Sequence, residues 1–204
     1  MKTVALAAAI ALLPCLSSAA IVTFTDRSTF EASAGTVTSE DFESQTVGTN
    51  LQNATIDLGD FTLSVASVFG TPFNLIDQSG FNAPNASIFA GIGLGDGETM
   101  TLLFDIAITS FGADFGALND FVQRSQFEVL ADILLAPILS GEASFFGFTS
   151  DTAFTSLVIR GLPESDGFGI DNVTYSVAPI PVPATLPLLA LGLGLLAFMR
   201  RRVV

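Results

Sequence analysis

The chain has 204 residues, of which half are hydrophobic and only 13% are charged. Residues 21–179 hold all twenty acidic residues but only three of the seven basic ones, a net charge of −17, which excludes nucleic-acid phosphate as a partner. There is no histidine, no tryptophan and only one cysteine, Cys15, so Ser-His-Asp, Cys-His and zinc-histidine chemistries are excluded as well.

The N-terminus has the pattern of an export signal. Lys2 precedes ten apolar residues at positions 4–13, Pro14 ends that helix, and the small residues 17–20 suit a cut after Ala20. Cys15 follows Pro14 rather than a small residue, so we do not expect a lipoprotein. We predict that residues 1–20 form a signal peptide, and cleavage would leave a mature chain without cysteine or disulfides.

Residues 21–177 carry the pattern of an all-β domain. Apolar and polar residues alternate at 61–65 and 127–133, and 101–106 and 155–160 are further short strands. Turn residues separate these runs, which indicates a sandwich or a barrel, and we predict an antiparallel β-sandwich. One helix is expected at Arg27–Ala34, with Asp26 as its N-cap and Gly35 beyond its end.

The glycine-rich stretch at 91–97 could be a phosphate cradle or a strand connection. It contains no lysine and no helix follows it, so we predict a connection between strands.

Eighteen of the nineteen phenylalanines lie in this domain, with one tyrosine. Phenylalanine has no polar group, so these rings are expected mostly in the core, and the shortage of Trp and Tyr argues against a lectin. Phe145, Phe146 and Phe148 could place rings on both faces of a strand. An exposed ring there would indicate a contact patch.

A glycoside hydrolase needs only two facing carboxylates, so this enzyme class stays open as an alternative. The candidates are Asp105, Asp114, Asp120 and Glu128. Asp114 and Asp120 bracket a turn at 116–119, where polar residues serve the turn itself. No nucleophile motif or metal-ligand cluster is present, and we predict no enzymatic activity.

The C-terminus resembles a membrane anchor. Residues 178–183 form a proline-rich tether, and the fourteen residues 186–199 carry no charge. That is short for a span of ~20 residues. Counting from Pro183 and letting Arg200 extend to the interface gives a marginal transmembrane helix. The cluster Arg200, Arg201 and Arg202 would lie in the cytoplasm.

The order of these three features resembles the PEP-CTERM sorting signal of exported proteins in Gram-negative bacteria. The motif has the VPLPA-like form, without a glutamate between its prolines, and comprises Pro181, Val182, Pro183, Ala184 and Thr185. The resemblance covers roughly residues 179–202, within a predicted sorting signal at 178–204. It implies recognition and cleavage by an exosortase at the inner membrane, then a place at the cell surface or outside the cell. It also implies association with exopolysaccharide and biofilm matrix.

The domain itself resembles the jelly-roll domains common in PEP-CTERM proteins. The resemblance lies in Asp41-Phe42-Glu43 near its start and in residues 168–175 at its end. Carbohydrate-binding jelly rolls often hold a structural Ca²⁺ through carboxylates at such places, which makes Glu43 and Asp171 the candidate ligands. The expected function is a non-catalytic surface or matrix protein, with a carbohydrate- or calcium-binding lectin-like module as the alternative.

Overall fold

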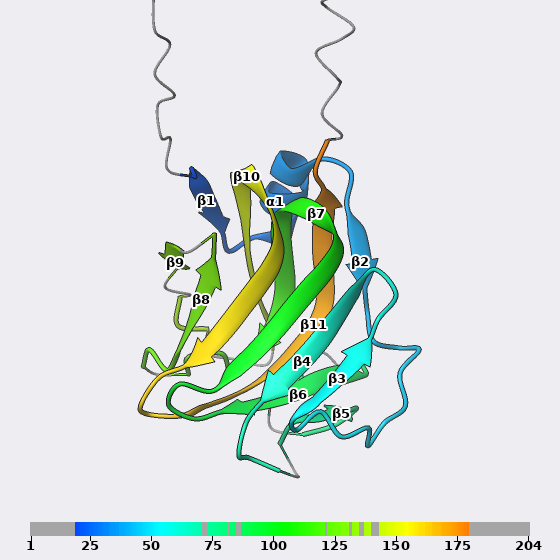
Figure 1. Cartoon of the computed structure of the whole chain (residues 1–204), viewed down its shortest axis with the longest axis vertical. Helices are drawn as coiled ribbons and strands as arrows, with labels where there is room; N and C mark the ends of the chain where they lie inside the picture. Colours follow the sequence, from blue (N-terminus) through cyan, green and yellow to red (C-terminus); the bar gives the residue numbers. More distant parts are fainter. Residues whose placement is uncertain are drawn as a thin grey trace, which may run out of the picture.

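The computed structural model describes residues 19–70, 73–80, 82–84, 87–120, 122–130, 132–134, 137–139 and 143–179. These residues form one large antiparallel sheet of eleven strands with one short helix (Figure 1). The mostly β fold predicted from the sequence is confirmed. The elements are β1 (Ile21–Phe24), α1 (Arg27–Ala34), β2 (Thr38–Glu40), β3 (Ala54–Asp57), β4 (Phe61–Ala66), β5 (Leu75–Asp77), β6 (Phe89–Leu94), β7 (Thr99–Gly116), β8 (Ser125–Val129), β9 (Asp132–Leu134), β10 (Ser144–Gly161) and β11 (Asp166–Val177).

Helix α1 begins and ends where the sequence predicts. Asp26 Oδ1 accepts the backbone N–H of Thr29 at 2.8 Å, and Gly35, at φ 81°, donates its N–H to Glu31 O. The helix buries one side chain, Phe30, whose ring lies 5.3 Å from that of Phe145. The buried ring of Phe30 therefore packs α1 against the sheet.

Two long strands, β7 and β10, organise the sheet. Each has 18 residues and they pair with one another along most of their length, with register shifts between Thr149 and Ser156. The first part of β7 pairs with β4 and its second part with β11. The first part of β10 pairs with β1 and its second part with β8. In Figure 1 β7 turns over at the upper end, so that the sheet folds back on itself.

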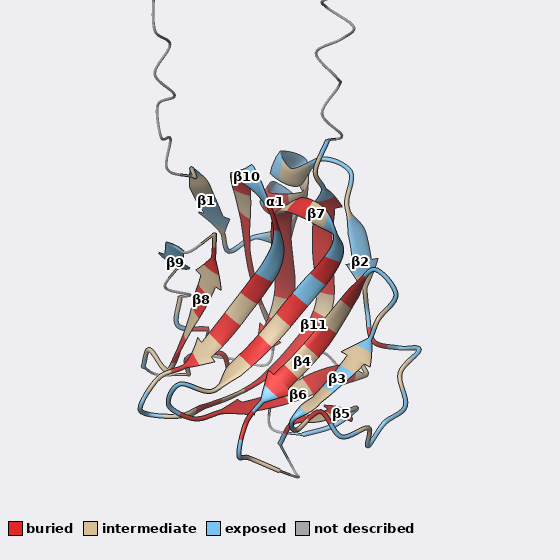
Figure 2. Ribbon diagram, in the orientation of Figure 1, coloured by how far each residue is buried: buried red, intermediate tan, exposed pale blue. Residues whose placement is uncertain are grey.

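Phenylalanine fills the space that this folding encloses. The ring of Phe127 lies 5.2 Å from that of Phe146 and 5.9 Å from that of Phe115, and all three are buried. Strand β4 alternates buried and half-buried residues, as its sequence pattern predicts, and Figure 2 shows this alternation along several strands. Phe145, Phe146 and Phe148 are all buried, so no exposed ring forms a patch there.

Two sequence predictions were wrong in detail. The run at 127–133 is not one strand, because Leu130 takes a left-handed conformation, φ 53°, and β8 and β9 pair with each other. The stretch at 91–97 is not only a connection, because Gly91 and Gly93 belong to β6 and pair with β11. At Gly93 a Cβ would lie 3.0 Å from Phe73 Cβ, so a close neighbour explains this glycine.

Within the ranges that the structure describes, no helix has the length and apolar character needed to cross a membrane. Residues 1–18 of the predicted signal peptide and the transmembrane helix predicted over 186–199 lie outside those ranges.

Candidate functional site

The two predicted calcium ligands, Glu43 and Asp171, contact the same short segment of the chain. Glu43 Oε1 accepts the backbone N–H of Ile88 at 3.0 Å. Asp171 Oδ2 accepts the hydroxyl of Ser87 at 2.6 Å. The fold therefore brings one carboxylate that follows β2 and one from the last strand to two consecutive residues, Ser87 and Ile88.

Asp171 is 1% exposed, and its charge is compensated by a network of hydrogen bonds. Asn172 donates its backbone N–H to Asp171 Oδ1 at 2.7 Å and its side-chain amide to Asp114 Oδ2 at 3.0 Å. Arg27 Nη2 in turn lies 2.9 Å from Asp114 Oδ1. These hydrogen bonds and this ion pair tie α1, β7 and β11 together.

The charge of Asp171 also affects the neighbouring Glu40. Burial raises the pKa of the Glu40 carboxyl, and the charges of Asp41 and Asp171 add to that rise.

Calcium requires six to eight oxygen ligands. Both carboxylate oxygens of Asp171 already accept hydrogen bonds from Ser87 and Asn172. Among the residues that the structure describes, no group of three or more acidic, cysteine or histidine side chains could hold a metal ion. The described residues do not by themselves fit a calcium ion, and the site at Glu43 and Asp171 stays a prediction.

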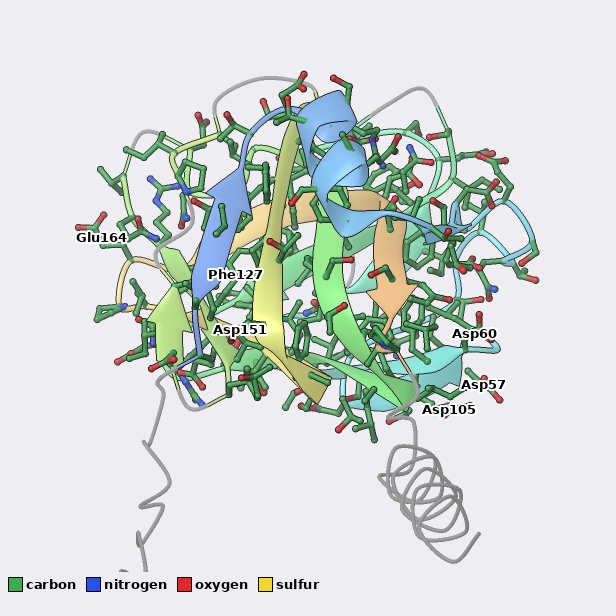
Figure 3. All side chains as sticks on the ribbon, turned by 90° about the horizontal axis from the view of Figure 1, so that it is seen from above. Asp57, Asp60, Asp105, Phe127, Asp151 and Glu164 are labelled. Carbon is green, nitrogen blue, oxygen red and sulfur yellow. The ribbon has the colours of Figure 1, made fainter. Side chains whose placement is uncertain are left out.

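The carboxylates considered for glycoside hydrolysis bond to different partners. Glu128 makes two bonds to Arg160, at 2.6 and 2.9 Å, which hold the pKa of its carboxyl below the usual range. Asp105 is exposed and its backbone N–H donates to Asp60 O, at the corner labelled in Figure 3. Asp120 donates its N–H to Ala117 O and closes the predicted turn.

A groove that the sequence did not predict runs over the outer face of β6 and β11. It consists of two cavities that share Phe73 and that we call together the Phe73 groove. One cavity, of about 200 Å³, is lined by Phe69, Phe73, Gly93, Ser165, Asp166 and Gly167. The other, of about 380 Å³, is lined by Phe73, Asp77, Gly80, Asn82, Phe89, Gly91, Ile92 and Phe168.

Glycines form the floor of this groove. Gly93 pairs with Gly167, and Gly91 with Gly169, across β6 and β11. Side chains alternate between the two faces of a strand, so these four positions leave one face of the pair without side chains. The alternation of glycine with apolar residues in both strands was the available sequence signal for a close neighbour on that face.

The described ends of the chain lie at the same end of the domain. Ala20 donates its N–H to Asp151 Oδ1 at 2.9 Å, and Ala178 donates its N–H to Ala107 O at 2.8 Å. In Figure 1 both ends leave the domain at the top, whereas β5 and β6 lie at the bottom. A cut after Ala20 would leave β1 complete, because that strand begins at Ile21.

The predicted sorting residues lie outside the described residues. They are Pro181, Val182, Pro183, Ala184 and Thr185, with the basic cluster Arg200, Arg201 and Arg202. Comparison of the chain with models of known protein families and with curated proteins found no match.

Proposed function

We propose that the chain is a non-catalytic exported protein of the cell surface or extracellular matrix, sorted by an exosortase through residues 178–204. The observation that carries this proposal is the position of the two described ends. Ala20, where the export signal would be cut, and Ala178, where the sorting signal begins, lie at the same end of the domain (Figure 1). A tether attached there leaves the opposite end of the domain facing away from the membrane.

We also propose that the domain is a jelly-roll-like β-sandwich. The pairing of β7 supports this, because its two parts join different neighbours, β4 and β11. The buried rings of Phe127 and Phe146 lie between the parts of the sheet. The rival reading as a glycoside hydrolase has less support, because none of its candidate carboxylates lines either cavity of the Phe73 groove; these are Asp105, Asp114, Asp120 and Glu128.

Replacing Pro181 and Pro183 together by alanine tests the sorting proposal. We expect uncut protein to accumulate in the inner membrane with its domain folded, because the enzyme must recognise an extended tether at the membrane surface. Cell fractionation and the mass of the intact protein measure this. Pro163→Ala, in the exposed turn between β10 and β11, is the matched control and should be sorted normally. Unchanged release and mass in the double variant would show that the C-terminal segment is a plain anchor.

A reporter fused after Arg202 tests the orientation. The three arginines beyond the apolar segment favour a cytoplasmic position for that end. An enzyme that is active only in the cytoplasm should therefore be active in the fusion. Activity of a periplasm-specific reporter at the same position would contradict the orientation.

A further inference from the structure

We propose that the Phe73 groove binds a neutral saccharide. This inference deepens the proposed surface function by naming the class of ligand and the residues that contact it. It rests on the proposed function only for the place where the protein would encounter the saccharide, outside the cell. The geometry of the groove does not involve the sorting signal.

The apolar part of the groove offers a ring and a flat floor. Phe73 is 44% exposed, unlike most phenylalanines of the described core, and its ring lies 6.0 Å from that of Phe69 at 67°. Below it, Gly93 and Gly167 place no side chain on the surface. A sugar ring has one face of C–H groups, which can lie against the negative face of an aromatic ring.

The polar part of the groove is rich in hydrogen-bond acceptors. Asn82 Oδ1 is buried and no donor within the described residues bonds it. Asp77 Oδ1 accepts the N–H groups of Gln78 and Ser79, at 2.8 and 3.3 Å, and Asp77 Oδ2 has no donor among the same residues. Asn82 Oδ1, a buried acceptor without a donor, costs free energy, and the half-buried Asp77 supplies a further acceptor, so a ligand that carries O–H groups would be stabilised here.

Charge selects against anionic ligands. Asp77 and Asp166 line the groove and no lysine or arginine does so among the described residues. Two of the domain's three arginines are engaged elsewhere, Arg27 with Asp114 and Arg160 with Glu128. A phosphate or uronate would therefore be repelled, whereas a neutral sugar supplies hydroxyl donors without a negative charge.

Size and position agree with a short stretch of saccharide. Cavities of about 200 and 380 Å³ fall below or near the lower end of the usual range for small-molecule sites, about 300–1,000 Å³, so one or two sugar rings suit them better than a large cofactor. Strands β5 and β6, which border the groove, lie at the opposite end of the domain from Ala20 and Ala178 (Figure 1). A polymer outside the cell could reach the groove there.

The test uses the full-length protein, purified in a mild detergent and applied to immobilised oligosaccharides. The panel contains neutral glucose, galactose and mannose oligomers, uronate oligomers and glucosamine oligomers. We expect retention of at least one neutral oligomer and none of the uronates. Stronger retention of glucosamine than of every neutral oligomer would identify a cation site and overturn the proposal, as would no retention of any neutral oligomer.

Variants then locate the binding, measured by calorimetric titration of the neutral oligomer that is best retained. Phe73→Ala should weaken binding about tenfold, as expected for an aromatic residue at the centre of a contact. Asp77→Asn keeps an acceptor for Gln78 and Ser79 but loses the carboxylate, and should also weaken it. The controls are Ile133→Ala and Asp105→Asn, both exposed and outside the groove, which should bind within twofold of the parent.

The circular dichroism spectrum and melting temperature of each variant show whether it is folded. Unchanged affinity in folded Phe73→Ala and Asp77→Asn would overturn the proposal. The sorting experiment is independent of this one. A protein that is sorted but binds no neutral oligomer defeats only the saccharide site, and one that binds but is not sorted defeats only the sorting proposal.

Discussion

Adding one methyl group at Gly169 should disturb the domain far more than adding one at Gly167. Both glycines lie in β11, two residues apart, and face the same outer side of the sheet. A Cβ at Gly169 would lie 2.2 Å from Asn82 O and 2.8 Å from Pro84 Cδ. The nearest atom to a Cβ at Gly167 is Asn82 Nδ2 at 3.4 Å, an ordinary contact.

The size of the effect follows from this difference. Both substitutions gain about 0.5–1 kcal/mol, because glycine in a strand loses more backbone entropy on folding than alanine does. Only Gly169→Ala must displace a backbone carbonyl by more than about 1 Å, and overpacking of this kind costs about 1–3 kcal/mol. For a domain of this size each kcal/mol shifts the melting temperature by about 2–4 °C. Gly169→Ala should therefore melt about 2–12 °C below Gly167→Ala.

Thermal unfolding followed by circular dichroism, on the full-length protein in detergent, compares the two variants. Gly116→Ala offers a further check, because Gly116 pairs with Gly169 and its Cβ would lie 2.1 Å from the same carbonyl of Asn82. It should behave like Gly169→Ala. If all three variants melt within about 1 °C of one another, Asn82 does not lie over these strands and the wall of the Phe73 groove is wrongly placed.

Two further predictions concern buried carboxylates. Burial raises the pKa of Asp166, which is 4% exposed, above 3.8, so its ionisation lowers the stability of the fold as pH rises through the folded-state pKa. Asp166→Asn, which keeps an acceptor for the Asn119 N–H, should be more stable than the parent at pH 7 and lose this advantage toward pH 4. Denaturant titrations at both pH values measure the free energy of unfolding. An advantage that grows at low pH would contradict the raised pKa of Asp166. If Glu43 and Asp171 share a calcium ion, the melting temperature should rise with millimolar Ca²⁺ and fall with chelator. At a hundredfold excess of Ca²⁺ over Kd, binding would add about 2.7 kcal/mol to the free energy of unfolding. Asp171→Ala should remove that response, and a parent midpoint indifferent to calcium would refute the site.

The parts of the fold that depend on neighbouring residues could be predicted from the sequence. Helix α1 is fixed by Asp26 and Gly35 at its two ends, and β4 by its alternation, so both appear where the pattern indicates. The break at Leu130 could not be predicted in this way. Leucine has no preference for φ 53°, and the conformation lets β9 pair back onto β8.

The Phe73 groove was missed for a different reason. Its floor exists only because Gly93 pairs with Gly167, more than seventy positions away in the sequence. Its exposed ring, Phe73, could not be distinguished by residue type from the phenylalanines of the core. Glu43 and Asp171 both contact the segment at Ser87 and Ile88. Whether an ion joins them depends on chemistry that the sequence pattern does not specify.

Strand β11 has a mechanical consequence for a tethered protein. It begins at the groove, where Gly167 forms part of the floor, and ends at Val177, just before the tether. It pairs with β6 along its first part and with β7 along most of its length. A polymer held in the groove at Phe73 and Asp77 would pull β5 and β6 lengthwise against β11 and the anchor, and the antiparallel hydrogen bonds, which lie across the strands, would share that force in shear. Stretching the protein between Asp77 and Ala178 should therefore need a larger force than stretching it between Ala20 and Ala178, which peels the short edge strand β1 from β10 one pair at a time. Equal unfolding forces in optical tweezers would show that β11 does not resist as a unit.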